Sequence, residues 1–555
     1  MEWPDIDYAT YDFETTITEM TVWRKAADAA LVDITLDHSV IGPKVAALRE
    51  RMAHCQDWSR EYRSIVEDFV NIMASVSNEQ ALDMAQAGLD ALHDLLLFRI
   101  DGKTVVPAKD VFILTNSFPK LETKTLVGSK APDIDFQFGL ANPTNPQEVL
   151  YGLDACAQVD AWHRYGVLET SAAVLAKTTF QQSPNLPSIL LNKRFVLLGC
   201  TSELGPAKSL LQVPGATILG IARGGKKLDD LLDYARYNAP DDTTFLYNPK
   251  GADLMSEGPQ IAQWILDQTT PQHELVIIPL AHLEGEADTR VVVAMDLIIQ
   301  RIFRQREKSI LCNYMCPTTV MVVPPTASTT AQQRYDTRPT WEKWTNTLTL
   351  GRWLQPCLPT KNNDYAIVNG IVTSLGSNHV LAKMVQMWRC MVSYYRDAHV
   401  VAAPFAPLTR TSTMVADDAM ASALEGMHHF EPMLAFDVEP ASTLMAAILV
   451  SQIQFMNRPL PDMEENPFTM FWDGAVHGGL WTCPYTMESI ATLNWAMGKT
   501  GYYPKGYIPP AAIMKSREER EQEPVRDPEE VFKEMENSTL GEDMPQCVKD
   551  RLDFL

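Results

Sequence analysis

The sequence predicts an α/β fold: a doubly wound parallel-sheet domain with a mainly helical N-terminal region and a C-terminal extension. Two observations carry this prediction. From Lys193 onward, short apolar runs alternate with helical segments, which is typical of βαβ units and a parallel sheet. Before Lys193, apolar residues recur at helical spacing, which indicates amphipathic helices. A chain of 555 residues is long enough for about two to four domains of ordinary size.

We expect four parts along the chain. Residues 1–190 form a mainly helical region with a small strand pair. Residues 191–455 form the sheet domain, with an insertion at about 330–365. Residues 456–514 form an extension packed on that domain. Residues 515–555 are highly charged and nearly free of large apolar side chains, so we expect an acidic, flexible tail.

Local signals support these elements. Ser77 is followed three residues later by Gln80, which is a capping-box pattern at the start of a helix. Short strands are expected on both sides of the turn at Asp101-Gly102. The runs expected to form the first five sheet strands, and then a later one, are RFVLLGC, ATILGIAR, TTFLYN, HELVIIPLA, TTVMVVPP and HVVAAPFAP.

The net charge of −23 argues against a nucleic-acid surface and against binding to an anionic membrane. No run approaches the roughly 20 consecutive apolar residues that a membrane span needs. The first residues, MEWPDIDYAT, are acidic and lack the basic and apolar regions of a signal peptide. We therefore expect a soluble, cytoplasmic protein. An organelle stays open, because a cleaved transit peptide would not be visible.

The nine cysteines are scattered and odd in number, which suits a reducing compartment. Cys312 and Cys316, in the run CNYMC, are the closest pair. Zinc sites prefer two such pairs, and the sequence has no second one. We expect ordinary thiols here and no bound metal.

The run LLGCTSELGPAKSLL joins the first strand to a helix, where a dinucleotide-binding turn would lie. Gly199 and Gly205 occupy plausible first and last glycine positions of such a turn. Thr201 and Ser202 offer hydroxyls and N–H groups to phosphate. Glu203 is awkward, because a carboxylate beside pyrophosphate repels it unless it points to solvent. The alternative is a tight turn without a ligand.

The second strand ends at Arg223, which is followed by Gly-Gly-Lys-Lys. An acidic residue here binds the ribose hydroxyls of NAD, whereas a basic one favours a 2′-phosphate. The expected cofactor is therefore NADP(H). The alternative is a set of surface basic residues.

The run SNHVLAK opens an amphipathic stretch and places His379 and Lys383 one helical turn apart. With LGCTSELG and HVVAAPFAPLTRTSTM, it resembles the short-chain dehydrogenase/reductase family. LGCTSELG resembles that family's TGxxxGxG turn. SNHVLAK resembles its YxxxK element, with His379 where the catalytic tyrosine would be. The ketoreductase domain of the fungal and mycobacterial type I fatty acid synthases is the branch closest in texture, over about residues 190–450.

The resemblance assigns further residues. VVPPTAS resembles the strand end that delivers the catalytic serine, so Thr326 or Ser328 is expected to polarise the substrate carbonyl. GADLMSEGPQIAQWI resembles the segment whose aspartate contacts the adenine. The loop TRTSTM resembles the one that closes over the nicotinamide. The cofactor contacts implied in these last two segments are Asp253, Thr409, Thr411 and Thr413.

What the resemblance implies is an NADP(H)-dependent reduction of a carbonyl, with a 3-oxoacyl thioester as the specific substrate. His379 would supply the proton that a tyrosine normally does, and Lys383 would hold the ribose. Tyr335 and Tyr365 are alternative acids. The segment 444–500, rich in Met, Trp and Phe, is a candidate lining for an acyl pocket.

The competing hypothesis is a non-catalytic protein that keeps the reductase fold as a scaffold or as a subunit of a larger assembly. The replaced tyrosine and Glu203 favour it, whereas Lys383 and Arg223 favour the enzyme. Under either hypothesis we expect a homo-oligomer or a subunit of a larger complex.

Overall fold

A computed structural model gives the structure of most of the chain. The tail predicted over 515–555 lies outside the described residues, as do parts of the extension predicted over 456–514. The described residues are 11–29, 38–100, 104–112, 118–133, 135–349, 353–357, 365–455 and 466–500.

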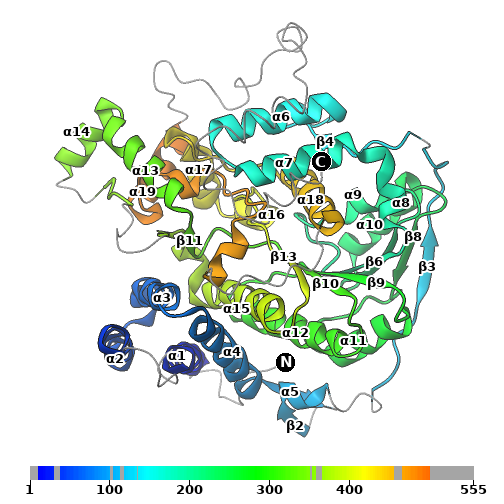
Figure 1. Cartoon of the computed structure of the whole chain (residues 1–555), viewed down its shortest axis with the longest axis horizontal. Coiled ribbons are helices and arrows are strands. Elements are labelled where there is room, and N and C mark those ends of the chain that lie inside the picture. Colours follow the sequence, from blue (N-terminus) through cyan, green and yellow to red (C-terminus); the bar gives the residue numbers. More distant parts are fainter. Residues whose placement is uncertain are drawn as a thin grey trace, which may run out of the picture.

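The architecture is α/β, with a mostly parallel seven-stranded sheet at its centre (Figure 1). The strand order is β13-β10-β9-β6-β7-β8-β3. All neighbours are parallel except β3, which pairs antiparallel with β8 at one edge. This order of the six parallel strands is compatible with a Rossmann-like fold. In chain order the strands are β3 (Lys124–Val127), β6 (Lys193–Leu198), β7 (Thr217–Ile221), β8 (Thr244–Tyr247), β9 (Glu274–Pro279), β10 (Ser309–Cys312) and β13 (Val400–Ala402).

The prediction for the fifth strand was wrong. The run TTVMVVPP forms β11 (Val320–Val323), which pairs antiparallel with β12 (Ala366–Asn369) in a separate two-stranded sheet. The fifth parallel strand is β10, which pairs with β9. Both runs are apolar and fully buried, so hydrophobicity alone does not distinguish them. β10 reaches the sheet because it follows the preceding helix after a short loop.

The sheet carries a hydrophobic core on each face. Along β6, Phe195 and Leu197 join one core and Val196 and Leu198 join the other, because successive strand residues point to opposite faces. Figure 1 shows the two helical layers on either side. One layer contains α6 (Gly152–Tyr165), α7 (Thr170–Gln181), α8 (Leu186–Leu190), α9 (Ala207–Leu211), α10 (Lys226–Asn238) and α18 (Val438–Phe455); the other contains α11 (Gly258–Asp267), α12 (Glu286–Phe303) and α15 (Gly376–Tyr395).

The N-terminal helices form an additional layer beneath α15 (Figure 1). The predicted capping box is confirmed, since the Ser77 hydroxyl accepts the N–H of Gln80 at the start of α4. Trp388 of α15 packs edge-on against Trp23 and near Phe69. The predicted strand pair is also present, as β1 (Leu97–Ile100) and β2 (Thr104–Pro107). The helices are α1 (Tyr11–Ala29), α2 (His38–His54), α3 (Trp58–Ser75) and α4 (Asn78–Leu95).

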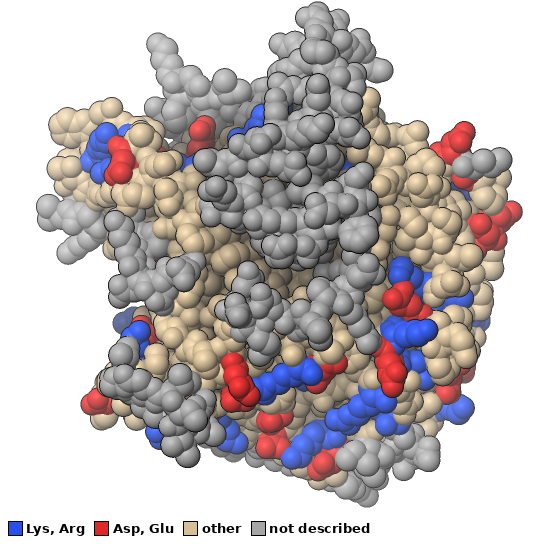
Figure 2. Space-filling model, viewed as in Figure 1, with Lys and Arg blue, Asp and Glu red and all other residues tan. Residues whose placement is uncertain are grey.

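Apart from α18, the segments around the insertion and after the last strand are mainly helical and lie at one end of the sheet (Figure 1). None of the described helices is long and apolar enough to cross a membrane. On the face viewed in Figure 2, described residues of both charge signs alternate along the lower rim. The remaining elements named in this article are α13 (Pro325–Thr337), α14 (Thr340–Leu348), α16 (Ser412–Ala416), α17 (Asp418–Gly426) and α19 (Met487–Thr500).

Candidate active site

A cavity of about 1420 Å³ opens at the carboxyl ends of β6, β7, β9 and β10. The sheet order reverses between β6 and β9, and ligands of doubly wound sheets bind beside such a reversal. Residues far apart in the sequence meet in its walls. The predicted site residues that line it are Gly199, Thr201, Ser202, Arg223, Asp253, His379, Lys383, Thr409, Thr411 and Thr413.

Three predicted site residues do not line this cavity. Thr326 and Ser328 lie on α13, after β11, and not in the cavity wall. Both were expected in the site because β11 had been predicted to be the fifth strand of the parallel sheet. Gly205 lies at the end of the turn, where a Cβ would approach Leu280 Cδ1 to 2.9 Å. Its lack of a side chain therefore serves close packing.

The alternative acids and the expected acyl lining are also absent from the walls. Tyr335 lies in edge contact with Tyr485, and Tyr365 lies near the Ser75 hydroxyl. No described residue of 444–500 lines the cavity. Its larger apolar side chains come instead from other segments, and they include Met255, Met315, Met414 and Met420.

The turn after β6 requires glycine at its first position. Gly199 has φ +96°, and a Cβ there would meet the backbone N of Ala281 at 2.7 Å. The helix that follows, α9, has only five residues. Arg223, Lys226 and Lys227 are exposed at the cavity rim, where their cations suit a phosphate group. The glycine turn, the hydroxyls and these cations fit a phosphorylated dinucleotide.

Glu203 does not point freely to solvent. Its carboxylate accepts hydrogen bonds from the backbone N–H (2.8 Å) and the hydroxyl of Ser412, and it pairs with Lys227 at 3.3 Å. Burial raises the pKa of Glu203, but these bonds outweigh it and hold that pKa below the usual value. The carboxylate thus joins the glycine turn to the start of α16, across one end of the cavity.

The other predicted cofactor contacts have internal hydrogen bonds. Asp253 accepts the N–H groups of Met255 and Ser256. Thr409 donates to the Pro407 carbonyl, and Thr411 caps α16. These bonds fix the loops after β8 and β13 while leaving the residues in the cavity wall.

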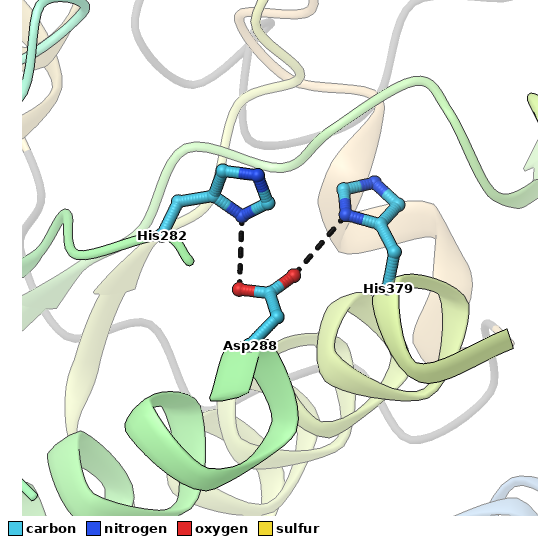
Figure 3. Close-up of side chains that lie close together, drawn as sticks. All are labelled: His282, Asp288 and His379. Carbon is cyan, nitrogen blue, oxygen red and sulfur yellow. Dashed lines mark hydrogen bonds and ion pairs between the residues drawn. The ribbon is translucent and has the colours of Figure 1, made fainter. Parts of the chain in front are cut away.

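Asp288, which the sequence analysis did not single out, is the centre of the site (Figure 3). It lies in the first turn of α12 and its side chain is 1% exposed. His379 Nδ1, on α15, lies 3.1 Å from one carboxylate oxygen, and His282 Nδ1, after β9, lies 2.9 Å from the other. Lys383 Nζ lies 3.9 Å away. A bond from the Thr289 hydroxyl to the Asn378 carbonyl, 3.0 Å, fixes α15 against α12.

These contacts indicate which ring nitrogen of His379 carries the titrating proton. Burial alone would raise the pKa of Asp288, but Lys383, His282 and His379 together hold it well below its usual range. An ionised carboxylate only accepts, so Nδ1 of His379 donates to it. Burial lowers the pKa of His379, but the Asp288 bond and Cys316 outweigh burial and Lys383, so the pKa is raised. The proton that titrates is therefore the one on Nε2.

Nε2 of His379 faces a hydroxyl and a thiol on the cavity wall. It lies 2.7 Å from Thr318 Oγ1, which lies 2.9 Å from Cys316 Sγ. Both residues follow β10 and line the cavity. Thr318 therefore lies in the loop after the fifth parallel strand and lines the cavity there, whereas the resemblance had led us to expect Thr326 or Ser328.

His282, Asp288 and His379 could also be considered as metal ligands, because their donor atoms lie within 4.8 Å of one another. Both Nδ1 atoms, however, donate a proton to the carboxylate and so present no lone pair. The Lys383 cation beside Asp288 also disfavours a second cation. We interpret the group as a hydrogen-bonded cluster.

Sequence reasoning missed Asp288, His282 and Thr318, and it interpreted Cys316 as an ordinary thiol. The run AHLEGEAD contains both a histidine and a carboxylate at a helix start after a buried strand, and this signal could have indicated the first two. Thr318 and Cys316 could have been found only with β10 correctly assigned.

No protein-family model matches the chain, and no curated protein matches it either. The resemblance to the short-chain dehydrogenase/reductase family therefore stays a prediction.

Proposed function

We propose that the protein is an NADP(H)-dependent oxidoreductase of the short-chain reductase type, which reduces a carbonyl, specifically that of a 3-oxoacyl thioester. The observation that carries the proposal is the Asp288–His379 pair at the carboxyl end of a Rossmann-like sheet. It presents a proton on Nε2 of His379 inside a cavity whose rim carries the cations of Arg223, Lys226 and Lys227. A reductase needs both features.

In this proposal each residue has one role. The nicotinamide, when bound, supplies a hydride. Nε2 of His379 gives its proton to the oxygen of the reduced carbonyl, and Asp288 stabilises the imidazolium beforehand. The Thr318 hydroxyl donates to the same oxygen, and Lys383 holds the ribose. Arg223 pairs with the 2′-phosphate.

Titration with NADPH and NADH, followed by nicotinamide fluorescence and by thermal shift, tests cofactor binding. We expect NADPH to bind more tightly than NADH. Arg223→Ala should weaken NADPH binding by about tenfold or more, because it removes a charge-assisted hydrogen bond. Arg236→Ala, which removes an exposed arginine on α10, is the matched control and should change little. No binding at millimolar NADPH would exclude the enzyme.

Turnover of 3-oxoacyl thioesters by the NADPH-bound protein then tests the reaction. His379→Phe should abolish turnover and leave the affinity for NADPH within about twofold. Equal turnover in the variant would remove His379 as the acid.

The second candidate, a non-catalytic reductase-fold scaffold or subunit, is favoured by the Glu203 carboxylate beside the turn and by the short α9. NADPH binding without reduction of any thioester tested would support it.

A further inference from the structure

Cys316 lies at the cavity wall in line with a buried histidine–carboxylate pair. Its Sγ is 2.9 Å from Thr318 Oγ1, and that oxygen is 2.7 Å from His379 Nε2. Asp288 accepts the proton on the far side of the same imidazole. The side chain of Cys316 is partly exposed, and it lines the cavity of about 1420 Å³. A thiol, a hydroxyl and an imidazole thus lie in contact at the cavity wall, with the carboxylate on the far side of the imidazole.

The carbonyl reduction proposed above leaves this thiol unused. A thiolate is a far stronger nucleophile than a thiol, and a neighbouring imidazolium favours it. The charged groups facing Cys316 are His379 and Lys383 on α15, with Asp288 of α12 and His282 of the loop after β9 beyond them. The two charged groups that act on the thiol are therefore cations, and the Asp288 carboxylate lies on the far side of the His379 ring.

The other described cysteines lack this environment. Burial raises the pKa of Cys200 to about 12 and that of Cys390 to about 12. Partly exposed Cys357 also has a pKa raised by burial, to about 11. For Cys316 burial acts in the same direction, but His379 and then Lys383 outweigh it and lower the pKa to about 7.

We propose that Cys316 is a nucleophile that accepts an acyl group from an acyl thioester, with His379 as its base and Asp288 as the residue that orients the imidazole. The choice of a thioester rests on the proposed function, whereas the nucleophile itself does not. The relation among thiol, imidazole and carboxylate follows the logic of acyl-transfer triads, in which the carboxylate fixes the tautomer.

The step is balanced without a further reactant. Nε2 of His379 takes the thiol proton, and Sγ of Cys316 forms a bond to the thioester carbonyl carbon. The bond from that carbon to the incoming sulfur then breaks. The leaving thiolate takes the proton from Nε2. The products are an acyl-Cys316 thioester and a free thiol, with no net oxidation or reduction.

The test uses the full chain and the 3-oxobutanoyl thioester of N-acetylcysteamine, without NADPH. After an acid quench, peptide mass spectrometry should find the acyl group on Cys316. Cys316→Ala should lose this adduct. The matched control, Cys357→Ala, should retain it, because Cys357 lies outside the cavity lining. His379→Gln should slow the acylation of Cys316 by about tenfold or more. An adduct found equally on Cys357, or none on Cys316, would overturn the proposal.

A second measurement needs no variant. The rate of iodoacetamide alkylation is followed at each cysteine of the unmodified protein as the pH is varied. At pH 7 we expect Cys316 to react about tenfold faster than Cys357. A Cys316 rate with the midpoint of an ordinary thiol, about 8.5, would contradict the ion pair.

The two proposals fail separately. Acylation of Cys316 by a protein that does not bind NADPH would support the nucleophile and exclude the reductase. Thioester reduction without any acyl-Cys316 would exclude the nucleophile and leave the reductase standing.

Discussion

His379 has its titrating proton on Nε2 because Asp288 accepts the one on Nδ1. Lys383 alone would disfavour the imidazolium, as expected for two neighbouring cations. The Asp288 carboxylate lies near both groups, 3.1 Å from the His379 ring and 3.9 Å from the Lys383 ammonium. Its negative charge favours the protonated ring and opposes the effect of Lys383. A histidine can therefore hold a transferable proton where a reductase would otherwise place a phenol.

Neutralising Glu203 should increase the affinity of the protein for NADPH. Glu203→Gln removes a negative charge beside the glycine turn but keeps the shape of the side chain. We expect NADPH to bind about fivefold more tightly, because a partly exposed charge of the wrong sign near a phosphate costs about 1 kcal/mol. Fluorescence titration at low and high salt measures this, and the gain should shrink in high salt.

Asp233→Asn, an exposed change on α10, controls for net charge and should leave the affinity unaltered. Weaker binding in Glu203→Gln would mean that the bond to Ser412 keeps the α16 loop in its binding position.

At single positions, the sequence could indicate only those candidate residues that share a recognisable short motif. His379 and Lys383 were singled out because SNHVLAK resembles the YxxxK element, whose two residues lie one helical turn apart. Asp288 was missed because a carboxylate at a helix start also reads as an ordinary dipole partner. Thr318 and Cys316 follow a four-residue strand, and no local pattern marks them as wall residues.

Among the elements, α12 connects the site to the rest of the molecule. Its first turn carries Asp288, and about two turns later Asp296 is buried against Arg389 of α15 and His93 of α4. His93 Nε2 lies 2.7 Å from the Asp296 carboxylate. The N-terminal helical layer is thus joined to the helices of the sheet domain through a buried ionic group.

His93→Ala should destabilise this contact. A hydrogen bond to a charged group contributes about 1.5–3 kcal/mol, and Asp296 would lose one of its buried partners. Urea unfolding should show a loss of about 2 kcal/mol or more, and amide exchange should rise in α4 ahead of the sheet. His54→Ala is the control, because His54 is exposed and bonds within its own helix; it should cost less than about 0.5 kcal/mol. Equal losses in both variants would show that His93 makes no special contact.

Element type was easier to predict than element partner. Alternating apolar runs indicated the strands β6 to β9 and their parallel order. For β10 and β11 the runs SILC and VMVV are equally buried, so burial could not indicate which one joins the sheet. The second is followed by Pro324 and Pro325, which cannot donate to a ladder and end the strand.

For the whole molecule, the pattern predicted an α/β sheet but not what covers its edge and faces. β3 comes from the region expected to be mainly helical, yet it pairs with β8 and closes one sheet edge. α6 and α7 come from the same region and cover one face with α18. The apolar stripe of an amphipathic helix shows which side of the helix is buried, but it does not show which surface of the protein buries it.

The two buried aspartates of α12 should make the stability of the whole chain sensitive to acid. Cation and histidine partners outweigh the effect of burial and hold the pKa of Asp288 and of Asp296 well below the usual range. Such groups contribute stability that is fully present above pH about 4 and is lost as the pH falls below it, because the unfolded chain then binds more protons. Each adds about 1.4 kcal/mol per pH unit to the slope of the unfolding free energy.

Asp296→Asn should therefore reduce that slope by about 1.4 kcal/mol per pH unit between pH about 2 and 4, measured by urea unfolding followed by circular dichroism. The variant should also be less stable at neutral pH, since Arg389 loses its anion. An acid slope identical to that of the unmodified chain would mean that Asp296 titrates normally in the folded protein.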